Sequence, residues 1–140
     1  MLVYVGQAPS PRAMRMFTQL GQHVHPHCRA AGKALLAQLG DDEVRGILGR
    51  VGMPSMTEAT ITDAEQFIAQ LAQVREEGVA HEVGEMEEGV ICLATPVPGG
   101  VTRLALSISG PASRMTKQLQ AEAIPVLQEV SEQLAMQLAG

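Results

Sequence analysis

The sequence is poor in aromatic side chains and in positive charge. Phe, Trp and Tyr make up only 2% of the 140 residues, and the formal net charge is −5. Proteins that bind nucleic acid need a basic surface, and those that bind single strands also use aromatic rings for stacking. These shortages argue against direct binding of nucleic acid by this chain.

The sequence also lacks long hydrophobic runs. No apolar run approaches the roughly 18 residues of a membrane-spanning helix, and residues 1–10 show no signal-peptide pattern. Cysteine is limited to Cys28 and Cys92, both among apolar neighbours, which favours reduced buried thiols over a disulfide framework. We therefore expect a cytoplasmic protein without membrane partners.

What is present is typical of one globular domain. Hydrophobic residues account for 46% of the chain, including eight Met, so Leu, Val, Ile, Ala and Met must fill the core. Residue periodicity and turn signals predict an α+β fold, an antiparallel sheet flanked by helices. The expected strands are residues 1–7, 12–17, 79–83, 90–97 and 101–109, the last two joined by a hairpin at residues 98–100.

Four helices are expected between and after these strands. They cover residues 28–39, residues 42–50 with Asp41 as cap, the segment from the capping box of residues 62–65 to Glu77, and residues 116–138. Gly78 is expected to end the third helix, and Pro125 to kink the fourth. The predicted apolar stripe of the fourth helix comprises Leu119, Ala123, Val126 or Leu127, Val130, Leu134 and Leu138.

Ser107 and Ser109 are the first candidates for a binding site. They alternate with apolar residues, so they should point to the same side of one strand, which we expect to break at Gly110 and Pro111. A buried hydroxyl without a partner costs about 1–3 kcal/mol. Either the protein or a polar ligand must therefore satisfy these two groups.

The start of the first expected helix is a second candidate. Ala30, Ala31 and Gly32 are small, so a carboxylate or phosphate could approach the unpaired N–H groups of the first turn. The alternative is that these residues are small because another element crosses closely.

His23, His25 and His27 are spaced so that an extended segment would place them on one side. This pattern could seat a metal ion, but solvent-facing histidines, or His27 orienting the helix start, explain it equally well, and we predict no metal site. The acidic residues of the loop before residue 90 should be solvated, and only Glu82 is expected to turn inward. No catalytic or phosphate-binding motif is present, so we expect neither an enzyme nor a cofactor.

Four segments in order resemble one known family. They are HCRAAGKALLAQL at 27–39, ITDAEQFIAQLAQVREEG at 61–78, EEGVICLATPV at 87–97 and LSISGPASRMT at 106–116. Together they resemble the effector-binding domain of IclR-type bacterial transcription regulators. The resemblance implies a GAF-like fold that binds a small organic acid, and a homodimer or homotetramer that binds DNA through an N-terminal winged helix-turn-helix domain. Residues 1–140 would then form a single effector-binding domain, truncated at its N-terminal part and without the DNA-binding domain.

The resemblance also implies which residues form the ligand site. The backbone of Ala30 and Ala31 would meet the carboxylate together with Ser107 and Ser109, and Glu82 stands where the family often has Asp. The implied apolar walls are Met16, Val24, Val90 and Cys92, with Met14 as a further candidate. Arg29, Glu82 and Val79 depart from the family pattern. Two other functions stay open: a ligand-free dimerisation module, and a small enzyme that uses Cys28 or Cys92 with a histidine.

Overall fold

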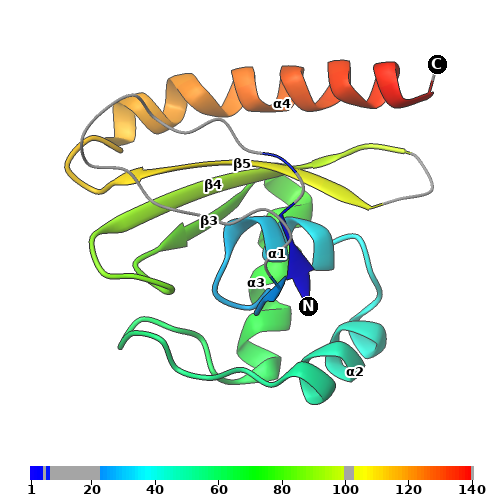
Figure 1. Cartoon of the computed structure of the whole chain (residues 1–140), viewed down its shortest axis with the longest axis vertical. Helices are drawn as coiled ribbons and strands as arrows, with labels where there is room; N and C mark the ends of the chain where they lie inside the picture. Colours follow the sequence, from blue (N-terminus) through cyan, green and yellow to red (C-terminus); the bar gives the residue numbers. More distant parts are fainter. Residues whose placement is uncertain (5, 7–22, 100–102, 140) are drawn as a thin grey trace.

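The computed structural model describes residues 1–4, 6, 23–99 and 103–139. Its centre is an antiparallel sheet in the order β3 (Ala80–Val83), β4 (Val90–Val97) and β5 (Leu104–Pro111). The long helix α4 (Lys117–Ala139) covers one face of this sheet, and the short helix α1 (Ala30–Leu36) lies on the other (Figure 1). The expected α+β architecture, an antiparallel sheet flanked by helices, is confirmed.

Alternation along the strands divides the core between the two faces. Ala80, Cys92 and Ala94 face α1 in the larger hydrophobic cluster, whereas Leu93 belongs to the smaller cluster with Leu127 of α4. Ser107 alternates with Leu106 and therefore lies on the α1 face. The prediction that Ser107 and Ser109 point to the same side is confirmed.

Helices α2 (Asp41–Val51) and α3 (Ala64–Glu77) extend the core beyond α1. The start of α3 differs by one residue from the predicted capping box. Asp63, not Thr62, is the N-cap, and its carboxylate accepts the backbone N–H of Gln66 at 3.0 Å. Asp41 is likewise the first residue of α2 rather than its cap, which is Gly40. Gly78 ends α3 in the left-handed conformation at φ 71°, as predicted.

Helix α1 is shorter than the predicted range of residues 28–39 because the chain crosses itself at its start. A Cβ atom on Gly32 would lie 2.1 Å from the carbonyl oxygen of Pro26, so only glycine fits there. The close approach of the backbone at Pro26 therefore explains why residue 32 is small. The turn at residues 27–28 precedes α1, and residues 37–38 form another turn after it.

Two strand predictions need correction. Gly110 and Pro111 do not break β5, because they pair with Ile91 and Val90, and Pro111 is tolerated at the last position of a strand at the sheet edge. At the N-terminus, the structure describes only β1 (Leu2–Val3), which pairs antiparallel with β2 (His23–Val24). The predicted strand at residues 12–17 lies outside the described residues.

The predicted apolar stripe of α4 is not the side of the helix that packs on the sheet. The residues that α4 buries are Leu127 and Ser131, whereas Val126 and Val130 are exposed at 58% and 42%. The helix continues through Pro125, so the proline does not end it. None of the helices within the described ranges is both long and apolar enough to cross a membrane.

Candidate functional site

A polar row crosses the three-stranded sheet beneath α1. Glu82 of β3 pairs in register with Cys92 of β4, which in turn pairs with Ser109 of β5. The Cys92 Sγ lies 3.1 Å from the Ser109 Oγ. Three strands therefore present a carboxyl, a thiol and a hydroxyl side by side on one face.

The two ends of this row differ in solvent access. Glu82 is only 1% exposed and Cys92 8%, whereas Ser109 is exposed and Ser107 is half-buried. The premise that both hydroxyls are buried is thus wrong for Ser109. Water can satisfy Ser109, and for the same reason a ligand can reach it.

Glu82 is held by its own loop. Its Oε2 accepts the backbone N–H of Glu85 at 3.0 Å. Burial raises the pKa of the Glu82 carboxyl, and the Glu85 N–H opposes this rise. The inward orientation predicted for Glu82 is confirmed.

The start of α1 carries an arginine that packs against a tyrosine. Arg29 is the N-cap residue, with extended backbone and no side-chain cap. Its Nη1 donates to the hydroxyl of Tyr4 at 3.0 Å, and its Cζ lies 5.5 Å from the centre of the tyrosine ring. Ala30 and Ala31 follow and are both buried.

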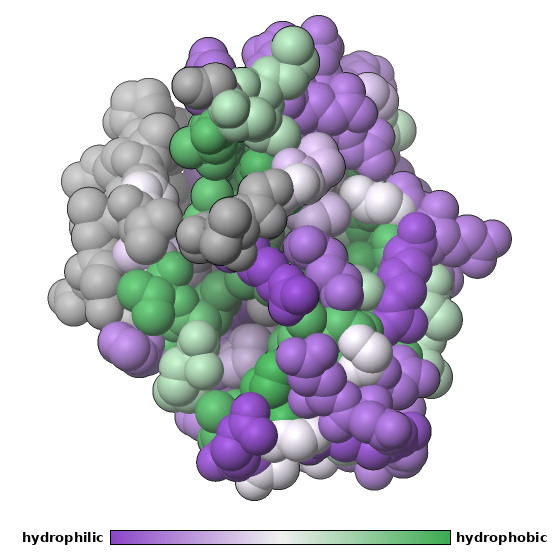
Figure 2. All heavy atoms as spheres, turned by 90° about the vertical axis from the view of Figure 1, so that its right-hand side faces the viewer, coloured by the Kyte–Doolittle hydropathy of each residue, from purple (hydrophilic) through white to green (hydrophobic). Residues whose placement is uncertain are grey.

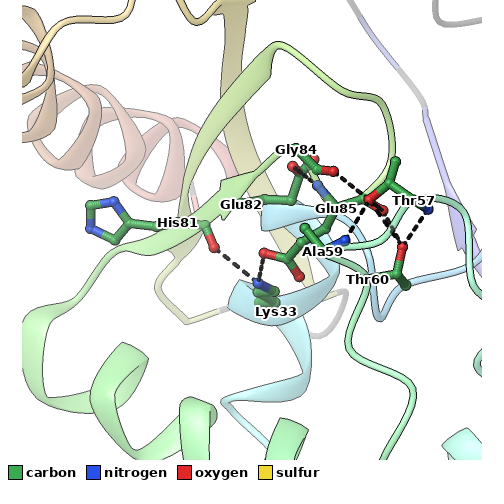
Figure 3. A network of polar contacts seen from close by, with 8 residues as sticks. All are labelled: Lys33, Thr57, Ala59, Thr60, His81, Glu82, Gly84 and Glu85. Carbon is green, nitrogen blue, oxygen red and sulfur yellow. Dashed lines mark hydrogen bonds and ion pairs between the residues drawn. The ribbon is translucent and has the colours of Figure 1, made fainter.

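A buried ion pair, which the sequence did not predict, joins α1 to the loop after β3 (Figure 3). The Lys33 Nζ donates to Glu85 Oε2 at 2.7 Å and to the carbonyl oxygen of His81 at 3.0 Å. Thr57 and Thr60 donate to the backbone carbonyls of the same loop. The expectation of a solvated acidic loop is therefore wrong for Glu85. The available signal was a lysine within an otherwise apolar helical segment, since such a lysine needs a partner if its face is buried.

The three histidines differ in burial and in their contacts. His27 is fully buried and its Nε2 lies 2.9 Å from the carbonyl oxygen of Pro54, and burial lowers the pKa of its imidazole. The His25 ring stands edge-on to it, with centroids 5.7 Å apart, whereas His23 is exposed. Within the described ranges, no group of three or more His, Cys, Asp or Glu side chains could hold a metal ion.

The two cysteines are unsuited to nucleophilic catalysis. Burial raises the pKa of Cys92 to about 12 and also raises that of Cys28. At neutral pH both side chains are therefore thiols rather than thiolates. This weakens the alternative of a cysteine-dependent enzyme.

Most of the implied ligand residues belong to the hydrophobic cluster between α1 and the sheet. Val24 and Val90 contribute to it, as do Ala30, Ala31 and Cys92. Met14 and Met16 lie outside the described residues. The structure thus brings the start of α1 to the same sheet face as the polar row.

Comparison with known proteins identifies the family. Residues 1–136 match the domain described as "Bacterial transcriptional regulator IclR C-terminal". The regulator KdgR of Escherichia coli K12 is 39% identical over 93 residues, which are 66% of this chain and 35% of KdgR. The chain thus matches about a third of the length of that relative.

Solved structures agree on the fold. A putative transcriptional regulator from Rhodococcus sp. RHA1 superposes with a TM-score of 0.89 at 32% identity, covering 98% of this chain and 57% of that one. The PobR inducer-binding domain from Acinetobacter, a double mutant in complex with 3-hydroxybenzoic acid, gives 0.76 at 30% identity, covering 84% and 69%. The GAF-like α+β fold is confirmed. The chain belongs to the IclR family of bacterial transcriptional regulators and corresponds to their C-terminal domain.

Proposed function

We propose that this domain senses a small organic acid in the cytoplasm and controls DNA binding by a winged helix-turn-helix domain outside this sequence. The observation that carries the proposal is the row of Glu82, Cys92 and Ser109 beneath α1. It sets a buried carboxyl and an accessible hydroxyl on a face whose other residues, apart from Ser107, are apolar. A small ligand with polar groups at both ends suits that pattern.

The acid would lie between the start of α1 and β5. Its carboxylate would meet the N–H groups of Ala30 and Ala31 together with the hydroxyls of Ser107 and Ser109. Glu82, whose pKa is raised by burial, can donate as well as accept when protonated, which suits a hydroxyl or oxo substituent. The complex of the PobR inducer-binding domain with 3-hydroxybenzoic acid supports this ligand class.

Binding can control DNA only if the acid prefers one arrangement of paired domains. Reversing an equilibrium from 1:99 to 99:1 needs about a 10⁴-fold preference for one state. The outward face of α4 supports pairing in a homodimer or homotetramer, because Leu119, Val126 and Val130 lie on one side of the helix and are exposed at 41%, 58% and 42%. On the side of the molecule that faces right in Figure 1, Figure 2 shows exposed hydrophobic side chains (green) between hydrophilic ones (purple).

Calorimetry with pyruvate, lactate and 3-hydroxybenzoate tests the proposal. We expect Ser109→Ala to weaken binding about 5-fold, the value of roughly one hydrogen bond. Ser55→Ala is the matched control, because Ser55 is exposed and bonds within its own turn. Unchanged affinity in Ser109→Ala would count against the site.

Sedimentation equilibrium, with and without the acid that binds, tests the quaternary part of the proposal. We expect Val126→Glu to reduce association, because it places a charge on the exposed apolar face of α4. A monomer at all concentrations, with and without acid, would refute pairing through this chain.

A further inference from the structure

Among the described residues, the only hydrogen-bond partner of the Arg29 guanidinium is a neutral group, whereas several other basic side chains contact carboxylates. Its Nη1 bonds to the Tyr4 hydroxyl, and its Nε is buried without a hydrogen-bond partner among the described residues. By contrast, Lys33, Arg45 and Arg75 each lie within 4 Å of a carboxylate oxygen. Arg29 makes no such contact within the described ranges.

This arrangement leaves a half-buried positive charge without a carboxylate partner among the described residues. A guanidinium has five N–H donors in a planar fork and always carries its charge, and a tyrosine hydroxyl offers it only a neutral acceptor. Removing a charge from water without an opposite charge is unfavourable. An anion beside Arg29 would relieve that cost, and a planar carboxylate matches the fork.

The position of Arg29 places this charge at the candidate site. Arg29 immediately precedes Ala30, at the end of α1 that packs on the sheet face. Its hydrogen-bond partner Tyr4 packs against the hydrophobic cluster that contains Cys92. The positive charge of Arg29 also opposes the rise in pKa of Cys92 and Cys28. Cys92 in turn contacts the exposed Ser109.

We propose that Arg29 determines the charge specificity of the site, pairing its guanidinium with the carboxylate of a small hydroxy or oxo acid whose substituent faces Glu82 and Cys92. The inference rests on the proposed function, since it concerns the same ligand. It assigns recognition of the carboxylate mainly to a side chain that departs from the family pattern. It further implies that the domain rejects neutral analogues of its effector.

Calorimetry on the 140-residue chain with acids and matched amides tests this assignment. The probes are pyruvate, lactate and 3-hydroxybenzoate, each beside its amide. For Arg29→Gln we expect about 30-fold weaker binding of the acid, equivalent to ~2 kcal/mol, and little change for the amide. Arg29→Lys keeps the charge without the fork and should fall between the two.

Arg50→Gln is the matched control, because Arg50 is exposed at the far end of α2. A thermal unfolding midpoint measured for each variant verifies folding. The ratio of acid affinity to amide affinity reports charge specificity, which a purely structural role of Arg29 would leave unchanged. If Arg29→Gln binds acids as tightly as Arg50→Gln while Ser109→Ala weakens them, the Arg29 assignment fails and the proposed function stands. If the unmodified chain binds none of the acids, both fail.

Discussion

The Lys33–Glu85 pair offers a sharp test of how this fold is held together. The Lys33 side chain is fully buried and that of Glu85 is 9% exposed, with 2.7 Å between Nζ and Oε2. The pair links α1 to the loop between β3 and β4, so it also fixes the loop that holds Glu82. We predict that removing one partner is much more costly than removing both.

The magnitude follows from two opposing terms. At an effective dielectric constant of about 20, charges this close attract by roughly 6 kcal/mol. Burying them costs several kcal/mol for each ion, so the net contribution of the intact pair is small. Lys33→Met or Glu85→Leu alone should each cost about 3–5 kcal/mol, because each leaves one buried group without its partner. The double variant Lys33→Met/Glu85→Leu should cost less than either.

Urea unfolding followed by circular dichroism measures these differences. The exposed pair of Arg45 and Glu65, 3.0 Å apart, is the matched control, and Arg45→Met should cost less than about 1 kcal/mol. If Lys33→Met costs no more than Arg45→Met, the buried pair does not stabilise α1 as argued. A double variant as destabilised as the sum of its singles would refute the coupling between the two charges.

Three further predictions concern single positions. Gly32→Ala should destabilise the fold by about 3 kcal/mol or more, because its Cβ would lie 2.1 Å from the carbonyl oxygen of Pro26. Gly49→Ala, where the added Cβ meets open space, should stabilise the fold slightly. Thermal unfolding compares the two variants, and equal midpoints would contradict the close crossing at Gly32. The pKa of Cys92 is raised from 9.0 to about 12, so stability is lost as pH rises above 9, by about 2 kcal/mol at pH 10.5. Urea titrations at pH 8 and 10.5 should show that loss, and it should be smaller in Cys92→Ser. Asp63→Ala removes the N-cap of α3 and should cost about 1 kcal/mol in urea unfolding, and an unchanged midpoint would show that the cap is dispensable.

Local patterns predicted the element types well and their ends less well. The predicted strand at residues 90–97 has the bounds of β4, and Gly78 marked the end of α3. Errors arose where a distant segment decided the outcome. Gly110 and Pro111 stay in β5 because β4 pairs with them. The side of α4 that is buried is the one that packs on the sheet, and it is not the apolar stripe predicted from the sequence.

For the candidate site, the residues were easier to predict than their surroundings. The inward position of Glu82 and the shared side of Ser107 and Ser109 follow from strand alternation. Their solvent access does not, since the exposure of Ser109 depends on how the distant helix α1 covers that face of β5. The sequence likewise did not predict that Glu85 pairs with Lys33, because the two residues are 52 positions apart in the chain.

The amino-acid sequence by itself determined the α+β class, the main helices and strands, the family likeness and the shared side of Ser107 and Ser109. These depend on periodicity, turn residues and motifs, which act over a few neighbouring positions. Only the tertiary structure decided which charges pair, which hydroxyl meets solvent and why Gly32 must be glycine. Those outcomes depend on contacts between segments far apart in the chain, whose geometry exists only once the core has packed.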